Sequence, residues 1–204
     1  MNGLRFDALY YAETFRAMAE DAFGWPLESL HEQDSTTGLV RREMDQETPW
    51  HKLFYALTES DAFRREYRLR LLATVRHWLF EDFYAQSVPT LRVQYPRNRA
   101  VGEWHRDTDY GHQPSELTVW MPLTEVDASQ SVVFDGIAHP LHFGECLVFD
   151  AANTLHGNTL STSPHTRVSF DFRVIPRSLY LPSEARSINT RQRFVVGDYF
   201  FDPS

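Results

Sequence analysis

Apolar residues recur at helical spacing near the start of the chain and then give way to a polar segment. Between residues 5 and 23 the apolar side chains fall on one face of a helix, and Gly24 and Pro26 end the pattern. Residues 28–48 are polar and contain no aromatic side chain. We therefore predict one amphipathic helix over 5–23, followed by a surface loop with a short turn or strand around residues 38–42.

Helical spacing returns at Pro49 and continues to Ala85. Pro49 suits the first position of a helix and Thr48 suits the capping position before it, so a first helix is predicted to end near Leu57. From Thr58 onward apolar residues recur every three or four positions, which predicts a second helix. Arginines cover most of its other side. We interpret them as a solvated face paired with local acids rather than as a nucleic-acid site.

Beyond Val88 and Pro89 the chain changes to short runs in which apolar and polar residues alternate. Runs of this kind cover residues 90–95, 101–107, 116–123, 131–138, 145–150, 153–158 and 165–175. Strands that follow helices predict an α+β fold, a β-sandwich or jelly roll with the N-terminal helices packed on one sheet. The aromatic-rich residues 193–201 are expected to add an edge strand or an arm that packs on the protein.

Length and composition fit a single domain of 204 residues, with helical support over 1–88, a core over 89–176 and a C-terminal arm over 177–204. A formal net charge of -8 disfavours binding to nucleic acid or to an anionic membrane, so a small-molecule partner is expected. Cys146 is the single cysteine and starts an apolar run, which predicts a buried, inert thiol. The chain shows neither a signal peptide nor an apolar stretch of roughly 20 residues, and we expect a soluble, cytoplasmic protein. Its oligomeric state is not indicated.

The run Arg167–Val174 alternates strictly between polar and apolar side chains. Its polar face carries Arg167, Ser169, Asp171 and Arg173. Because the N-terminal helices need a sheet surface to cover, we expect the apolar face to lie under a helix and the polar face to line a pocket. Two further runs place polar side chains on one face, Arg92 with Gln94 and Thr118 with Trp120. Trp120 fits a core position and a pocket wall equally well.

An arginine inside such a pocket needs an anionic partner, because an unpaired buried charge is strongly destabilising. For Arg167 this partner is either Asp171, two residues along on the same face, or the carboxylate of a ligand, which a guanidinium group matches bidentately. In the second case the hydroxyl group of Ser169 is placed to donate to the same carboxylate.

The segment Trp104–Asp107 places an imidazole and a carboxylate two residues apart, and residues i and i+2 of a strand point to the same face. His105 and Asp107 are therefore candidate ligands of a divalent first-row metal, and His156 is the candidate third ligand. Two imidazoles and one carboxylate form the facial triad of non-haem Fe(II) oxygenases. Asp109 is also in phase with His105 and is an alternative carboxylate ligand, less favoured by spacing.

The order of these residues resembles the Fe(II)/2-oxoglutarate-dependent dioxygenase superfamily. It combines H-x-D at His105–Asp107, a distal histidine 49 residues after Asp107, and R-x-S starting 11 residues after His156. The resemblance covers residues 90–175 and includes flanking segments, namely Trp104, Thr118–Thr124, Leu147–Asp150 and His156–Asn158. The stretches 110–114 and 167–173 are most similar to small streptomycin-biosynthesis-type enzymes, which are phytanoyl-CoA-hydroxylase-like.

This resemblance implies a double-stranded β-helix (jelly-roll, cupin-like) core in which Fe(II) is held by the catalytic residues His105, Asp107 and His156. It further implies that 2-oxoglutarate chelates the metal and binds Arg167 and Ser169 through its distal carboxylate. We also expect co-substrate contacts from Gln94, Thr118 and Trp120. In such enzymes O2 oxidatively decarboxylates 2-oxoglutarate to succinate and CO2. Hydroxylation is the expected outcome because the carboxylate ligand, which is replaced in the halogenating branch, is present; desaturation and ring closure use the same oxidant.

The resemblance to the streptomycin-biosynthesis-type enzymes implies a small polar substrate of the amino-acid or aminocyclitol type, from a biosynthetic pathway such as antibiotic biosynthesis. Substrate-selecting residues are expected in the 28–48 loop, around 109–116 and in the C-terminal arm. Candidate substrate contacts are Arg92, Asp109, Tyr110, His112, Asp171 and Arg173.

Two other classes of protein fit parts of the pattern. A cupin-like metalloenzyme that does not use 2-oxoglutarate usually carries H-x-H and has no need for R-x-S. A non-catalytic jelly-roll binding module leaves the ordered triad and the arginine unexplained. The remaining histidines are interpreted as structural or surface side chains: His31, His51, His77, His139, His142 and His165.

Overall fold

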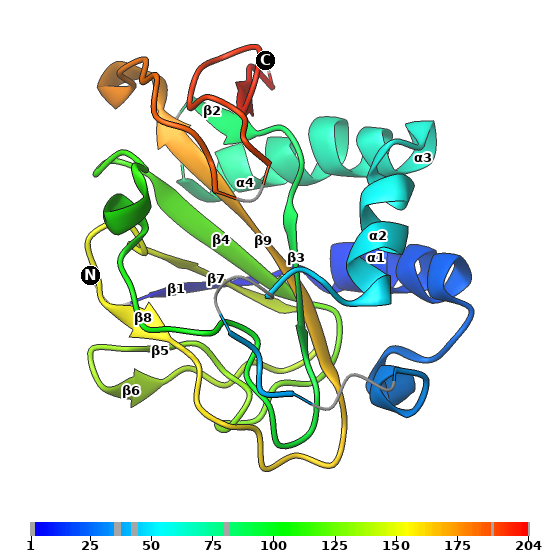
Figure 1. Ribbon diagram of the computed structural model, residues 1–204. Helices are drawn as coiled ribbons and strands as arrows, with labels where there is room; N and C mark the ends of the chain where they lie inside the picture. Colours follow the sequence, from blue (N-terminus) through cyan, green and yellow to red (C-terminus); the bar gives the residue numbers. More distant parts are fainter. Residues whose placement is uncertain (1–2, 35–37, 42–44, 80–81, 189, 204) are drawn as a thin grey trace.

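The computed structural model describes residues 3–34, 38–41, 45–79, 82–188 and 190–203, which form two antiparallel β-sheets and a layer of helices (Figure 1). The large, seven-stranded sheet has the order β1-β7-β4-β9-β2-β10, and β3 also pairs with β9. Its strands are β1 (Leu4–Asp7), β2 (Phe83–Gln86), β3 (Thr90–Gln94), β4 (Leu117–Pro122), β7 (Glu145–Phe149), β9 (Arg167–Pro176) and β10 (Phe200–Phe201). The small sheet has the order β6-β5-β8 and comprises β5 (Val133–Phe134), β6 (Ile137–Ala138) and β8 (His156–Gly157).

Helices cover one face of the large sheet (Figure 1). They are α1 (Leu9–Phe23), α2 (Pro49–Thr58), α3 (Asp61–Arg64), the π-helical η3 (Arg65–Leu71) and α4 (Leu72–Leu79). The ring of Phe170 in β9 lies 5.2 Å from that of Phe15 in α1, and the ring of Phe172 lies 5.3 Å from that of Tyr67 in η3. Short 3-10 helices are η1 (Leu27–Glu32), η4 (Asp107–Tyr110) and η5 (Arg177–Leu179). The predicted α+β arrangement, with helices packed on one sheet, is confirmed.

Strand β9 is buried on both faces. Its apolar side chains pack under the helices, so the alternating polar side chains turn to the opposite face, toward the loops that carry His105 and His156. Each of the four polar side chains is at most 6% exposed: Arg167, Ser169, Asp171 and Arg173. The polar face is therefore not a solvated surface, in agreement with the prediction of a pocket.

Two stretches with helical spacing form strands instead. The helix predicted from residue 5 begins only at Leu9, because β1 precedes it and pairs with β7. The second predicted helix ends at Leu79, and β2 follows and pairs with β9 and β10. Both predictions were wrong at these ends because the hydrogen bonds offered by a neighbouring strand outweigh the local apolar spacing.

Of the predicted strand runs, those that contain β3, β4, β7 and β9 are confirmed. The run 101–107 is not a strand: His105 makes an isolated bridge to His156, and Asp107 begins η4. In the remaining runs only the two-residue strands β5, β6 and β8 form. These segments are loops whose shape is set by hydrogen bonds to other loops, which an alternating pattern does not encode.

The two segments with the weakest pattern are partly described. Residues 38–41 form no strand, and Arg42, the other end of the turn or strand predicted there, lies outside the described residues. Within 193–201 only β10 is a strand, and it pairs with β2. Phe194 and Phe200 are fully buried, so the arm packs on the protein as expected. In the part of the chain that the structure describes, no helix combines the length and apolar content needed to cross a bilayer.

The single cysteine gives a test of this packing. Cys146 lies in β7 with no exposed surface, and burial raises the pKa of its thiol to about 12. Because the thiolate is the reactive form, we expect the folded protein to resist iodoacetamide at about pH 8. Complete labelling is expected once concentrated guanidinium chloride unfolds the chain. Rapid labelling of the native protein, followed by mass spectrometry, would contradict this packing.

Candidate active site

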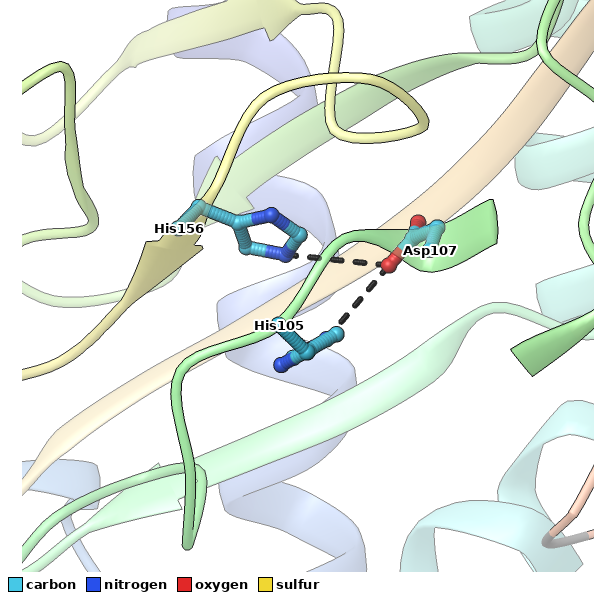
Figure 2. Close-up of side chains that lie close together, drawn as sticks. All are labelled: His105, Asp107 and His156. Carbon is cyan, nitrogen blue, oxygen red and sulfur yellow. Dashed lines mark ion pairs between the residues drawn. The ribbon is translucent and has the colours of Figure 1, made fainter. Parts of the chain in front are cut away.

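Two histidines and an aspartate meet beside the polar face of β9 (Figure 2). The Nε2 atoms of His105 and His156 lie 3.5 and 3.7 Å from Oδ1 of Asp107. One candidate ligand atom from each residue lies within 4.8 Å of the others, and all three residues are buried. The structure thus brings together the three residues predicted as metal ligands.

Backbone hydrogen bonds between two loops hold this cluster. His105 and His156 exchange both hydrogen bonds of a β-bridge, at 3.0 and 2.9 Å, and the Asp107 N–H donates to the Ala151 carbonyl at 3.0 Å. Asp107 therefore reaches the histidines through the turn that opens η4, and the predicted i, i+2 strand geometry is not the cause of their proximity.

The two imidazoles are oriented as metal ligands require. Nδ1 of His105 lies 3.2 Å from the Glu103 carbonyl oxygen, and Nδ1 of His156 lies 3.0 Å from that of Thr154. A carbonyl oxygen only accepts, so each Nδ1 carries the proton and each Nε2 keeps a lone pair that faces Asp107. Burial lowers the pKa of His156, which favours the neutral, ligating form.

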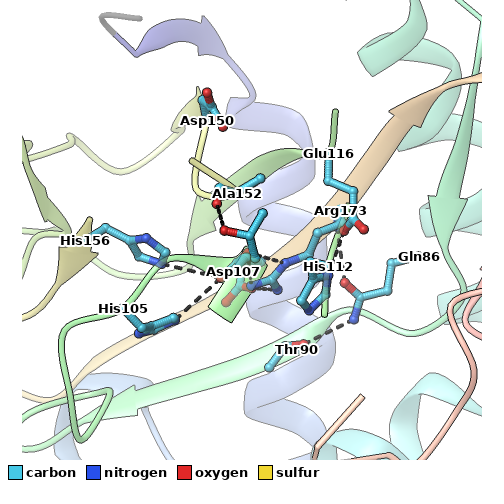
Figure 3. Close-up of polar contacts among 12 residues, drawn as sticks. Gln86, Thr90, His105, Asp107, His112, Glu116, Asp150, Ala152, His156 and Arg173 are labelled. Atoms are coloured by element: carbon cyan, nitrogen blue, oxygen red, sulfur yellow. Dashed lines mark hydrogen bonds and ion pairs between the residues drawn. The ribbon is translucent and has the colours of Figure 1, made fainter. Parts of the chain in front are cut away.

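The two carboxylate oxygens of Asp107 face different partners. Its Oδ2 accepts hydrogen bonds from Nε and Nη2 of Arg173 at 3.1 and 2.9 Å (Figure 3), and its Oδ1 faces the histidines. Burial by itself would raise the pKa of Asp107, but the positive charge of Arg173 holds it well below the usual range. Two neutral imidazole nitrogens and one ionised carboxylate oxygen on one side of a shared point fit a divalent first-row ion.

Asp109 does not belong to the site. Its side chain is exposed, and its Oδ2 accepts a hydrogen bond from the Arg106 N–H at 2.9 Å. It lies outside both the metal-ligand cluster and the cavities described below, so the structure does not bring it together with the other predicted ligands and substrate contacts. The turn of η4 directs the Asp107 side chain inward and the Asp109 side chain outward. The alternation of a strand would have placed both side chains on the same face.

An inner cavity adjoins the triad, and three of the predicted co-substrate residues contact the guanidinium group of a fourth, Arg167. Nη1 of Arg167 donates to Oγ of Ser169 at 2.5 Å and Nη2 donates to Oε1 of Gln94 at 3.2 Å. Nε1 of Trp120 donates to the same Ser169 oxygen at 2.9 Å, and the Trp120 ring lies 5.6 Å from the guanidinium carbon. Trp120, Thr118 and Arg167 line the cavity together with His105 and His156.

Arg167 is a buried cation that forms no ion pair with any of the described residues. It is 2% exposed, no carboxylate among the described residues forms an ion pair with it, and its Nε has no hydrogen-bond partner. Burial, together with repulsion from Arg92, lowers the pKa of its guanidinium group. Asp171, the alternative partner weighed above, pairs instead with Arg92 at 2.9 Å and with Arg173. Within the described chain, therefore, the buried cation faces a cavity beside the triad and lacks an anion.

An outer cavity lies on the other side of Arg92 and Arg173, which line both cavities, as do Val101 and His105. Of the predicted substrate contacts it contains Arg92, Tyr110, His112 and Arg173, whereas Asp171 lines the inner cavity. The sequence analysis missed lining residues from several segments: Asp45, Gln46, Gln86, Thr90, Glu103, Ser187, Ile188, Thr190 and Tyr199. The first two lie in the polar 28–48 loop and the last four in the C-terminal arm, where no periodic pattern marks individual residues.

His112 is held in the outer cavity by a buried acid. Its Nδ1 lies 2.7 Å from Oε2 of Glu116, whose side chain is buried, and its ring packs 4.4 Å from that of Phe194 in the arm (Figure 3 draws the pair of His112 and Glu116). The ring therefore has a fixed orientation. Glu116 also went unrecognised, because a lone glutamate before a strand carries no sequence signal.

The remaining histidines have structural or surface contacts, and none joins a metal-ligand cluster among the described residues. His51 is buried and its Nδ1 contacts Oγ1 of Thr48. The ring of His139 stacks on Phe134 at 3.7 Å. His142 pairs with a glutamate on the surface.

Comparisons with known proteins identify a relative of this chain. No protein-family model matches the chain. The streptomycin biosynthesis protein StrG of Streptomyces griseus is 39% identical over 179 residues, which cover 85% of this chain and 85% of StrG.

Solved structures share the fold. The non-haem α-ketoglutarate-dependent epimerase SnoN from nogalamycin biosynthesis superposes with a TM-score of 0.60 at 16% identity, covering 99% of this chain and 93% of SnoN. EctD from S. alaskensis gives a TM-score of 0.54 at 14% identity, covering 88% of this chain and 74% of EctD. A SnoN structure with Fe3+, α-ketoglutarate and a nogalamycin compound gives a TM-score of 0.59 at 14% identity, covering 99% of this chain and 94% of SnoN.

The relationship to StrG covers most of both chains, the shared fold extends to α-ketoglutarate-dependent enzymes, and the His105, Asp107 and His156 side chains converge as the motif requires. The chain therefore belongs to the family of the streptomycin biosynthesis protein StrG, and it shares its fold with non-haem α-ketoglutarate-dependent enzymes.

Proposed function

We propose that the protein is an Fe(II)/2-oxoglutarate-dependent oxygenase that hydroxylates an unactivated C–H bond of a small polar metabolite in antibiotic biosynthesis. In this proposal 2-oxoglutarate is converted to succinate and CO2. The substrate is of the amino-acid or aminocyclitol type.

The observation that carries the proposal is the guanidinium group of Arg167, which lines the cavity beside the triad and forms no ion pair among the residues that the structure describes. An isolated buried charge is strongly destabilising, so its presence is best explained by an anionic ligand. A carboxylate suits a guanidinium group, and the Ser169 hydroxyl adds a second polar contact. A ligand that spans from the triad to Arg167 carries a metal-chelating end and a distal carboxylate, which describes 2-oxoglutarate.

The protein side chains have separate tasks in this reaction. His105, Asp107 and His156 would hold Fe(II), and Trp120 and Thr118 would enclose the co-substrate. The metal, when bound, supplies the O2 activation that leads to C–H oxidation. Arg173 holds the outer oxygen of Asp107. The buried walls around the triad exclude water from the reacting groups.

The proposal also includes an assignment of the fold. We assign the two antiparallel sheets to a double-stranded β-helix, or jelly roll, because the triad and Arg167 lie between the large sheet and the loops of the small sheet. The helices within residues 1–88 support this core and described residues of the C-terminal arm line its outer cavity, within one domain.

The outer cavity supports a polar substrate. Val101 and Ile188 are the apolar side chains in its described lining, and the other lining groups are hydrogen-bonding or charged. Such a lining suits a molecule with several hydroxyl or amino groups, since buried polar groups need partners. His112, oriented by Glu116, is one such partner for the substrate.

An anaerobic titration tests the proposal. Adding 2-oxoglutarate to the Fe(II)-loaded protein is expected to produce a visible metal-to-ligand charge-transfer band. His156→Ala, which removes one ligand, should not give the band. A binding module or an enzyme that does not use 2-oxoglutarate would show no such band in the wild-type protein, and that result would refute the assignment.

The substrate class is tested by measuring succinate release over a panel of amino acids and aminocyclitols. We expect at least one aminocyclitol or amino acid to stimulate succinate formation, with an oxygen atom added to the product as detected by mass spectrometry. A product of unchanged mass would indicate epimerisation, the reaction named for SnoN, in place of hydroxylation.

A further inference from the structure

We propose that an alternating row of buried carboxylates and guanidinium groups positions Asp107 as a metal ligand and links it to the outer cavity. The row, called the charge chain below, consists of Asp45, Arg92, Asp171, Arg173 and Asp107. The inference rests on the proposed function only in that Asp107 binds the metal. Arg92, Asp171 and Arg173 thereby become positioning residues, in place of the substrate contacts expected from the sequence.

The charge chain is built by two neighbouring strands. Asp171 and Arg173 lie two residues apart on the polar face of β9, and Arg92 lies on β3, which pairs with β9. Nε of Arg92 donates to Oδ1 of Asp171 at 2.9 Å, and Nη1 of Arg92 donates to Oδ2 of Asp45 at 3.1 Å. Nη1 of Arg173 donates to the other oxygen of Asp171, and its remaining edge grips Asp107.

Each guanidinium group therefore bridges two carboxylates. Nε and Nη2 of Arg173 both bind Oδ2 of Asp107, which leaves Oδ1 as the oxygen that faces His105 and His156. The guanidinium group of Arg173 keeps this orientation on Asp107 only as long as Asp171 binds its Nη1. Because a guanidinium group is a rigid plane, fixing one edge fixes the other.

Burial makes these contacts depend on one another. The side chains of the charge chain are at most 12% exposed, so loss of one member leaves its neighbours with an uncompensated buried charge. Loss of Asp171 would leave Arg92 and Arg173 with one carboxylate each. We expect Arg173 then to shift on Asp107 and to disturb the ligand oxygen.

The outer end of the charge chain lies where a substrate would bind. Asp45 lines the outer cavity, and Arg92 and Arg173 form part of the wall between the two cavities. A substrate that contacts Asp45 therefore acts on a row of charges that ends at the metal ligand. By thermodynamic linkage, substrate affinity and metal affinity then change together.

The test is the affinity for Co(II), used alone as a spectroscopic substitute for Fe(II), in Asp171→Asn. Its Co(II) dissociation constant is expected to rise by about 10- to 100-fold, as for other residues that orient metal ligands, and the visible d–d bands should shift. Glu28→Gln is the matched control, because Glu28 also binds an arginine through both oxygens but lines neither cavity. It should bind Co(II) like the wild-type protein.

Thermal unfolding establishes that each variant is folded. If Asp171→Asn does not fold, Arg92→Lys replaces it in the test, since an ammonium group keeps the charge but cannot reproduce the two-sided contact. Asp45→Asn, at the outer end, should weaken Co(II) binding by about 2- to 5-fold, less than Asp171→Asn because it lies further along the row.

Unchanged Co(II) affinity and spectrum in a folded Asp171→Asn or Arg92→Lys protein would overturn the positioning role. An unaltered affinity in Asp45→Asn alone would overturn the link to the outer cavity. Failure of the wild-type protein itself to bind Co(II), with no change on His156→Ala, would refute the metal site and hence the proposed function. The two failures are thereby distinguishable.

Discussion

Asp107→Ala is expected to lower 2-oxoglutarate turnover by about 10³-fold or more, equivalent to about 4 kcal/mol of transition-state stabilisation. Asp107 is the anionic member of the triad, and its Oδ1 is the atom to which both histidine Nε2 atoms point. Alanine leaves two neutral nitrogens, which hold a divalent ion far more weakly than a triad does. Succinate release and Co(II) binding measure the two parts of the effect.

Asp109→Ala is the matched control for this experiment. The two aspartates are two residues apart, and the sequence alone offers both as ligands, but only Asp107 points into the site. Turnover by Asp109→Ala should stay within about twofold of wild type, because its exposed side chain contributes only a turn contact. If instead Asp109→Ala were inactive and Asp107→Ala active, the ligand assignment would be wrong.

The comparison of these two aspartates shows what the sequence can predict about the site. The order of H-x-D, a distal histidine and R-x-S identifies the residues that the fold brings together, because each carries a chemical requirement that few other arrangements meet. The strict alternation of β9 likewise predicts which face is apolar, and the helices do cover that face. The sequence therefore predicts features that depend on how the two faces of a strand or helix are buried.

The sequence does not predict features that depend on contacts between loops far apart in the chain. His105 and Asp107 were expected on a strand, yet their proximity to His156 comes from a single β-bridge and a turn. Asp45, Gln46 and the arm residues line the outer cavity without any periodic signal. The residue types of the charge chain were visible in the sequence. The contact between Arg173 and Asp107 was not, because the turn of η4 brings Asp107 to Arg173.

Arg167→Ala is expected to weaken 2-oxoglutarate binding by about 10- to 150-fold, which corresponds to a loss of about 1.5–3 kcal/mol for a charge-assisted, bidentate contact. The dissociation constant is measured anaerobically from the charge-transfer band of the Fe(II)-loaded protein. Arg167→Lys should recover part of the affinity, because an ammonium group keeps the charge but not the fork. An unchanged affinity in Arg167→Ala would show that the distal carboxylate binds elsewhere.

A stability measurement on the same residue separates a ligand-binding role from a structural one. Among the described residues, the buried cation Arg167 contacts the neutral Ser169, Gln94 and Trp120, and its Nε has no hydrogen-bond partner. Replacing it with methionine, which has an unbranched and uncharged side chain, should leave the free energy of unfolding unchanged or raise it. A residue kept for the fold would lose stability in that variant. The expected combination, lost 2-oxoglutarate affinity with retained stability, follows only if the charge is held in place for an anionic ligand.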